Sequence, residues 1–178
     1  MNNSQKYIAF LRGVNVNGTS IKMAEVCKVF SGADCKEVSS VLATGNIIFN
    51  SNLDKVALKE KLEKSLSEHF NYEAFLFIKT AEEVKTIFEH NPFSKDNDFH
   101  IYSFITIPNF ETELLKNFNE TEKTEGEEIK IVDHNFYWKI RKGFTLDSNF
   151  GKILGIKVFK NSLTSRNINT IEKIVAKL

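Results

Sequence analysis

The sequence predicts an α+β fold built from two βαββαβ halves. Short apolar runs that are typical of strands alternate with segments of helical periodicity over the first 80 residues. A looser copy of the same pattern follows in the second half of the chain. No stretch rich in Pro, Gly or Ser separates the two copies, so we expect the halves to share a core.

The first half begins with a strand and an amphipathic helix. The strand is expected at Tyr7–Leu11, and its continuous apolar run predicts burial on both faces. Helical spacing then runs from Ile21 to Phe30, and the helix should end near Gly32. Two further strands follow, joined by a tight hairpin whose glycine can adopt a positive φ. They are expected at Val38–Leu42 and Asn46–Asn50, with Ala43-Thr44-Gly45 between them.

The clearest helix of the sequence is expected at Leu53–Phe70, with Asp54 as its N-cap. The side chains that should point inward are Val56, Leu58, Leu62, Leu66 and Phe70. A strand at Ala74–Ile78 completes the half. The order βαββαβ is that of the ferredoxin-like fold.

The second half is expected to repeat this arrangement less regularly. Its predicted elements are a helix at Ala81–His90, a strand at His100–Ile107, a helix at Phe110–Phe118, a hairpin of Ile129–Val132 with Phe136–Ile140, and helical segments at Ser148–Leu154 and Asn167–Leu178. The charge run Glu120–Glu128 indicates a solvated loop. We therefore predict one ferredoxin-like half at 1–80 and a second at 81–178, whose C-terminal helix packs back on the first.

Composition excludes several classes of protein. Of the 178 residues, 42% are hydrophobic and 26% are charged, which is typical of a globular chain and not of a disordered one. The net charge is +1, so the field of the whole molecule does not steer it toward nucleic acid or an anionic membrane. Any basic binding surface must therefore be local.

The cysteines and the polar N-terminus indicate a cytoplasmic protein. Cys27 and Cys35 lie eight residues apart without a CxxC pattern, as expected in a reduced intracellular protein. The first six residues are polar, and no apolar run of about 18 residues follows. We expect no membrane partner, and the oligomeric state is left open.

Arginine is rare in this chain, and two of its three arginines lie in polar motifs. Arg12 lies in a motif dense in glycine and asparagine, and Arg166 lies in a second motif rich in hydroxyl and amide side chains. The guanidinium fork binds a carboxylate or phosphate at two points, which a lysine ammonium cannot do. The two motifs therefore predict one polar site for a small anionic ligand.

Strand order explains how such a site would form. In a 4-1-3-2 sheet, the exit of the first strand and the hairpin between the second and third strands lie at the same end. The following helix also starts there, and its N-terminus favours an anion. The candidate ligand-binding residues are Arg12, Asn15, Asn17, Lys22, Thr44, Asn46, Arg166 and Asn167.

Other kinds of site lack support in the sequence. Gly13 and Gly18 have the spacing of a phosphate loop, but Thr19 stands where a Walker lysine is required. The four histidines do not have metal-ligand spacing, and no nucleophile elbow is present. We therefore predict no metal and no cofactor, and whether the protein is an enzyme is left open.

The motifs taken together resemble a bacterial family known as a domain of unknown function, family 1697. They are Phe10-Leu11-Arg12-Gly13-Val14-Asn15-Val16, Ile21-Lys22-Met23, Thr44-Gly45-Asn46-Ile47-Ile48-Phe49 and Leu163-Thr164-Ser165-Arg166-Asn167-Ile168-Asn169-Thr170. The resemblance implies two ferredoxin-like halves and supports these motifs as the site, but it implies no particular chemistry. Thr44 stands where the family usually has serine, and Ile168 where it has tryptophan.

Two alternatives to anion binding stay open. A nucleic-acid-binding module would use the same basic edge and would show salt-dependent binding. A structural or interaction domain would have no ligand site, and Arg12 and Arg166 would then be buried against carboxylates. In that case the glycines would serve turns, and the asparagines and Thr164 would cap backbone groups.

Overall fold

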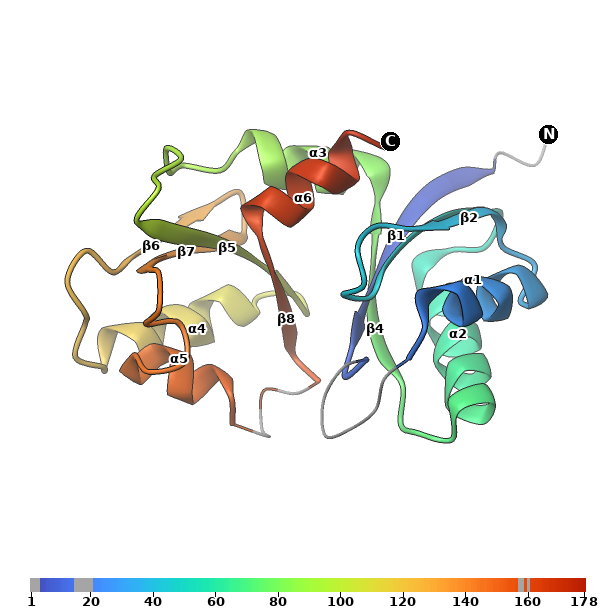
Figure 1. Ribbon diagram of the computed structural model, residues 1–178, viewed down its shortest axis with the longest axis horizontal. Helices are drawn as coiled ribbons and strands as arrows, with labels where there is room; N and C mark the ends of the chain where they lie inside the picture. The colour runs from blue at the N-terminus through green and yellow to red at the C-terminus, as the bar shows by residue number, and fades with distance from the viewer. Residues whose placement is uncertain (1–3, 15–20, 157–158, 160) are drawn as a thin grey trace. The chain divides into compact units, whose positions relative to one another are not determined.

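The computed structural model describes residues 4–14, 21–156, 159 and 161–178. It contains two four-stranded antiparallel sheets, each flanked by helices (Figure 1). The prediction of an α+β fold with two ferredoxin-like halves is thereby confirmed. A core shared by the halves stays a prediction.

The first sheet has the predicted strand order. Its elements are β1 (Gln5–Arg12), α1 (Met23–Gly32), β2 (Lys36–Ser40), β3 (Asn46–Ser51), α2 (Lys55–Phe70) and β4 (Phe75–Thr80). The strands lie in the order β2-β3-β1-β4, and β3 pairs antiparallel with both β1 and β2. The exit of β1 and the β2–β3 hairpin therefore lie at the same end of the sheet.

The second sheet repeats this topology, and one of its strands was not predicted. After α3 (Ala81–Glu89), the elements are β5 (Phe99–Thr106), α4 (Phe110–Asn119), β6 (Glu128–Val132), β7 (Asn135–Arg141), α5 (Asn149–Leu154), β8 (Leu163–Asn167) and α6 (Ile168–Val175). The strand order is β6-β7-β5-β8. The unpredicted strand, β8, is formed by the polar motif that the sequence suggested as a helix cap. Hydrogen bonding to β5 outweighs the weak strand propensity of its polar residues.

The chain divides into two compact units, which we call unit 1 and unit 2. Unit 1 comprises residues 1–85 with 173–178, and unit 2 comprises residues 86–172. The predicted boundary at residue 80, and the predicted packing of the C-terminal helix on the first half, stay predictions.

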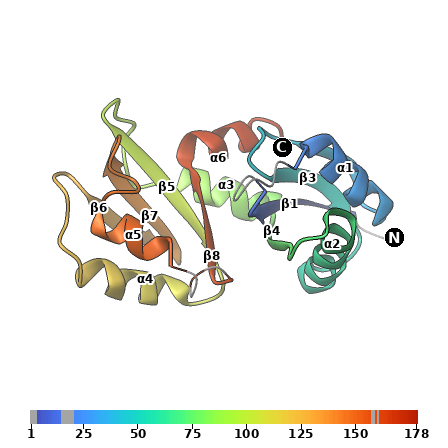
Figure 2. The same cartoon turned by 60° about the horizontal axis from the view of Figure 1, so that its bottom comes forward.

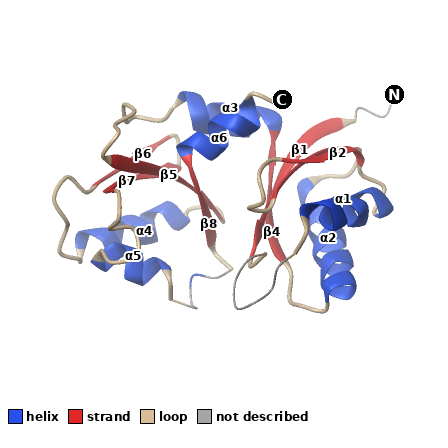
Figure 3. Cartoon of the chain, viewed as in Figure 1, coloured by secondary structure: helices blue, strands red, loops and turns tan. Residues whose placement is uncertain are grey.

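The core of unit 1 lies between its sheet and two helices. Helices α1 and α2 lie on the same face of the sheet (Figure 3). Tyr7, Ala9 and Leu11 of β1 belong to this core. Ile8 and Phe10, which point to the opposite face of the sheet, are also fully buried. Burial of β1 on both faces is therefore confirmed. The buried residues of α2 are Leu58, Leu62 and Leu66.

The prediction that Val56 points inward is wrong, because 79% of this residue is exposed. A helix turns by about 100° per residue, so Val56 lies roughly opposite Leu58 on α2. Asp54 does cap the helix as predicted, since its carboxylate accepts hydrogen bonds from the amides of Val56 and Ala57.

Unit 2 has an aromatic core beneath α4 and α5, which lie on one side of its sheet (Figure 2). Trp138 is buried and its indole N–H donates to Glu127 Oε1 at 2.9 Å. Glu127 is itself buried and also accepts from the amide and hydroxyl of Thr124. The end of the charge run is therefore part of the core boundary, contrary to the prediction of a solvated loop.

Candidate functional site

The β2–β3 hairpin packs directly against the exit of β1. Asn46 lies opposite Phe10, and the amide of Leu11 donates to the carbonyl of Gly45 at 2.8 Å. Gly45 has a φ of +74°, and a Cβ at this position would lie 2.9 Å from Leu11 Cβ. Both the backbone conformation and the close approach therefore require glycine.

Asn46 holds the hairpin loop in place from inside the protein. It is fully buried, and its amide donates to Val41 O at 3.0 Å and to Thr44 Oγ1 at 2.9 Å. The amide of Val41 donates in turn to Asn46 O at 2.9 Å. Leu42, which the sequence placed in a strand, instead has a φ of +60° within this loop. Asn46 and Thr44 thus shape the hairpin beside β1.

Arg12 is the last residue of β1 and is partly buried. It lies opposite Phe75 of β4, on the side of β1 away from the hairpin strand. Burial lowers the pKa of its guanidinium from the ordinary value. An arginine nonetheless keeps its charge at neutral pH. Partial loss of solvation makes an anionic or strongly polar partner more favourable at this position.

Lys22 lies immediately before α1 and is exposed. Its carbonyl accepts from the amides of Glu25 and Val26, but its own side chain does not cap the helix. The amide of Ile21 donates to Val14 O at 3.2 Å, which joins the start of α1 to the segment that follows Arg12. The predicted ligand residues Asn15 and Asn17 lie outside the described residues.

Arg166 lies on β8 in unit 2, two residues before the first residue of α6. It is opposite Ser103 of β5, and its Nη1 donates to Thr164 Oγ1 and to the carbonyl of Ser165, both at 2.9 Å. These contacts connect the side chain to its own strand.

Asn167 joins the end of β8 to the start of α6. Its Oδ1 accepts from the amide of Asn169 at 3.0 Å, in agreement with the capping role that the sequence suggested. Its Nδ2 lies 3.2 Å from His100 Nδ1. Sequence reasoning missed His100, since a lone histidine in a strand carries no pattern that indicates a partner.

The candidate residues thus fall into two groups. Arg12, Thr44 and Asn46 belong to neighbouring segments of unit 1, and Lys22 begins the next helix of that unit. Arg166 and Asn167 belong to unit 2. A single site formed by both groups stays a prediction.

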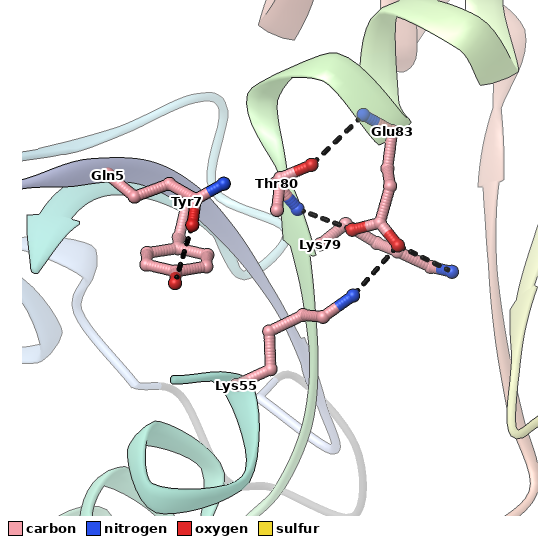
Figure 4. A network of polar contacts seen from close by, with 6 residues as sticks. All are labelled: Gln5, Tyr7, Lys55, Lys79, Thr80 and Glu83. Carbon is pink, nitrogen blue, oxygen red and sulfur yellow. Dashed lines mark hydrogen bonds and ion pairs between the residues drawn. The ribbon is translucent and has the colours of Figure 1, made fainter. Parts of the chain in front are cut away.

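A further polar network in unit 1 was missed although the sequence carries a signal for it (Figure 4). Thr80 and Glu83 form a capping box at the start of α3. The amide of Thr80 donates to Glu83 Oε2 at 2.7 Å, and the amide of Glu83 donates to Thr80 Oγ1 at 3.1 Å. Lys55 donates to Glu83 Oε1 at 2.8 Å. The spacing T-x-x-E is the sequence signature of such a box.

Several other kinds of site find no support in the described residues. They contain no group of three or more His, Cys, Asp or Glu side chains that could hold a metal ion. The aromatic residues Phe136, Tyr137 and Trp138 are buried and cannot act as a stacking platform for bases. Within the ranges that the structure describes, no helix combines the length and the apolar character needed to cross a membrane.

Comparison with known proteins supports the fold and identifies a family. A conserved bacterial protein from Streptococcus pneumoniae has a similar structure, with a TM-score of 0.80, 23% sequence identity and coverage of 98% of each chain. A search of curated proteins gave no significant match. The model of the family described as "Protein of unknown function (DUF1697)" matches residues 4–137, a range that ends before the Arg166 motif. Because this match spans well over half of the sequence, the chain belongs to that family.

Proposed function

We propose that the protein binds a small anionic ligand, bearing a phosphate or carboxylate group, at the edge of unit 1 where β1 ends. The observation that carries this proposal is the partly buried guanidinium of Arg12 beside a hairpin that packs on the strand exit. Arginine forms two parallel hydrogen bonds to such anions, and they are stronger where water is partly excluded.

Three of the candidate residues of unit 1 have distinct roles in this proposal. Arg12 supplies the charge and the paired donors, and exposed Lys22 adds a second positive charge at the start of α1. Asn46 does not contact the ligand, because it is fully buried and its amide already bonds Val41 and Thr44. It holds the hairpin that shapes the edge.

The proposed setting is the cytoplasm. Both cysteines are free, and Cys35 is buried. Free thiols persist in a reducing compartment, which supports this location. Fractionation of cells that express the protein would test it.

Ligand-dependent thermal stability tests the anion proposal. We expect one or more members of a panel of phosphate, pyrophosphate, citrate and nucleoside monophosphates to raise the melting temperature of the parent protein. At 100 times its Kd, a ligand stabilises a protein by about 2.7 kcal/mol. The change Arg12→Ala should weaken binding by about 1.5 to 3 kcal/mol, the range for a hydrogen bond to a charged group. Differential scanning fluorimetry and calorimetric titration measure both effects.

Arg141→Ala is the matched control for this experiment. Arg141 is exposed, lies in unit 2 and forms a 3.4 Å ion pair with exposed Glu125. Its removal should leave anion binding unchanged.

The structural alternative has one observation in its favour, which is the complete burial of Asn46 within its own hairpin. If no anion stabilises the parent protein and Arg12→Ala lowers its melting temperature, the edge has a structural role and the proposal is wrong. Binding of an oligonucleotide that weakens steeply with salt would support the nucleic-acid alternative instead.

A further inference from the structure

A short chain of hydrogen bonds connects β5, β8 and the start of α6 within unit 2. Asn167 lies opposite Tyr102 in the sheet, and His100 lies two residues before Tyr102 on the same face. The amide of Asn169 donates to Asn167 Oδ1 at 3.0 Å, and Asn167 Nδ2 lies 3.2 Å from His100 Nδ1. One asparagine side chain thus contacts both the helix start and the imidazole.

This arrangement determines the tautomer of His100. The backbone N–H of Asn169 is a donor only, so the side-chain atom of Asn167 that faces it must be the oxygen. The NH₂ group of Asn167 is then turned toward His100, and it too can only donate. His100 Nδ1 must therefore be an acceptor, which requires a neutral ring with its proton on Nε2.

Protonation of His100 is incompatible with this chain of hydrogen bonds. A proton on Nδ1 would face the NH₂ group of Asn167, so two donors would meet. Rotation of the Asn167 amide by 180° would restore that contact. It would also turn the NH₂ group toward the N–H of Asn169, which would lose its acceptor. In either orientation one of the two hydrogen bonds is lost.

We propose that His100 and Asn167 form a pH-sensitive switch, in which protonation of His100 releases the hydrogen bond that holds the first turn of α6. The switch has two discrete states, a neutral state with both hydrogen bonds and a protonated state with one. It does not depend on the anion site proposed above, because its residues lie in unit 2.

The surroundings of His100 favour the neutral state. Burial lowers the pKa of His100 from its ordinary value, and the positive charge of Lys142 lowers it further. Tyr102 packs beside the ring at 5.8 Å, and the residue opposite on β7 is the apolar Ile140. The acidic residue of α6, Glu172, has its carboxylate bound through both oxygens by Lys95, so its negative charge is already paired.

The direction of the pH effect follows from this lowered pKa. An unfolded chain takes up a proton at its histidine below a pH of about 6.5, whereas folded His100 stays neutral to a lower pH. The unfolded state therefore binds more protons in this window, so stability falls as the pH drops from about 6.5 to the folded pKa. Above that window His100 makes no pH-dependent contribution.

NMR and amide hydrogen exchange test the switch on the full chain. In the parent protein we expect His100 to titrate below its ordinary pKa, with the Nε2–H tautomer in the neutral ring. Protection of the amide of Asn169, corrected for intrinsic exchange, should fall by about tenfold as His100 becomes protonated, which corresponds to one hydrogen bond. His69→Gln, on exposed α2 surface in unit 1, is the control and should leave both results unchanged.

Two variants separate the switch from a purely structural contact. His100→Gln retains an acceptor for Asn167 but cannot be protonated, so the protection of Asn169 should become independent of pH. Asn167→Asp retains the acceptor for Asn169 and places a second acceptor beside His100. It should raise the titration midpoint of His100 by about one pH unit or more and reverse the pH dependence. A parent protein with the Nδ1–H tautomer, or an Asn167→Asp variant with an unchanged midpoint, would overturn the proposal.

Discussion

At the scale of single residues, the β2–β3 hairpin shows how a polar motif is used inside the fold. Gly45 permits both the positive φ and the contact with Leu11. The side-chain amide of Asn46 donates to Val41 and Thr44 within the loop, and Arg12 is the last residue of the adjacent strand. Residue types that suggest ligand binding in a sequence thus include some, such as Asn46, whose observed contacts are with the hairpin itself.

Replacement of Gly45 by alanine should be clearly more destabilising than the same change at Gly143. Both glycines have a positive φ, 74° and 88°, so both variants incur about 1–2 kcal/mol of backbone strain. A Cβ at Gly143 meets no atom within 4 Å, whereas at Gly45 it meets Leu11 Cβ at 2.9 Å and Leu11 O at 3.3 Å. The additional cost at Gly45 should be about 1–3 kcal/mol. Urea denaturation of the two variants measures the difference, and equal losses would contradict the prediction.

At the scale of elements, the start of α3 depends on contacts from two other elements. Glu83 caps its own helix through Thr80 and is bonded by Lys55 at the start of α2 (Figure 4). Lys79, at the end of β4, lies 3.9 Å from the same carboxylate. The strand, the helix that follows it and α2 are therefore joined at one side chain.

Glu83 should contribute stability that is lost in acid. Burial acts to raise the pKa of its carboxyl, but hydrogen bonds from Lys55 and the Thr80 amide, with the charges of Lys79 and Lys55, outweigh burial and lower it. This contribution is present above the ordinary value of 4.5 and is lost as the pH falls through the lower, folded value. Glu83→Gln can retain the capping box and should remove this pH dependence.

Glu83→Ala should also remove the cap, at a cost of about 1 kcal/mol at neutral pH. Glu82→Ala is the control, because Glu82 is largely exposed and its carboxylate forms a surface ion pair with Lys85, three residues further along α3. Chemical denaturation between pH 3 and pH 7 measures all three variants. A Glu83→Gln variant that follows the parent protein at every pH would rule out this role.

At the scale of the whole molecule, each unit has its own core and its own natural probe. Unit 1 buries Cys35 within its hydrophobic core, and unit 2 buries the single tryptophan, Trp138. The two probes therefore report on different parts of the chain. Unfolding of each unit can therefore be followed through a residue that the sequence already contains.

Cys35 should react slowly with thiol reagents until unit 1 opens. Burial raises the pKa of its thiol from 9.0 to about 11, so its thiolate population at neutral pH is about 100-fold lower than that of an ordinary cysteine. A Leu62→Ala change, which creates a cavity in the same core, should accelerate labelling. Mass spectrometry of alkylated peptides measures the rate at Cys35. Labelling of Cys35 as fast in the native protein as in urea would contradict this prediction.

The sequence by itself determined the fold class and the helices and strands that carry a clear apolar pattern, but not the polar strand β8. The apolar run of β1 and the period of Leu58, Leu62 and Leu66 on α2 reflect burial, which is the dominant local signal in a globular chain. The order of these strands and helices predicts two ferredoxin-like halves, because few chain topologies are compatible with the sequence of elements βαββαβ. The meeting of the β1 exit with the β2–β3 hairpin was predictable for the same reason.

Only the tertiary structure decided what the polar residues do. Asn46 is a buried hairpin residue, Arg166 lies on the edge strand β8, and Asn167 binds His100, a residue 67 positions away in sequence. A polar side chain forms whichever hydrogen bonds its neighbours in space offer, and neighbours from distant strands leave no periodic trace in the sequence. The local pattern of apolar residues therefore predicts which side chains are buried, whereas the hydrogen-bond partners of polar side chains depend on the complete tertiary fold.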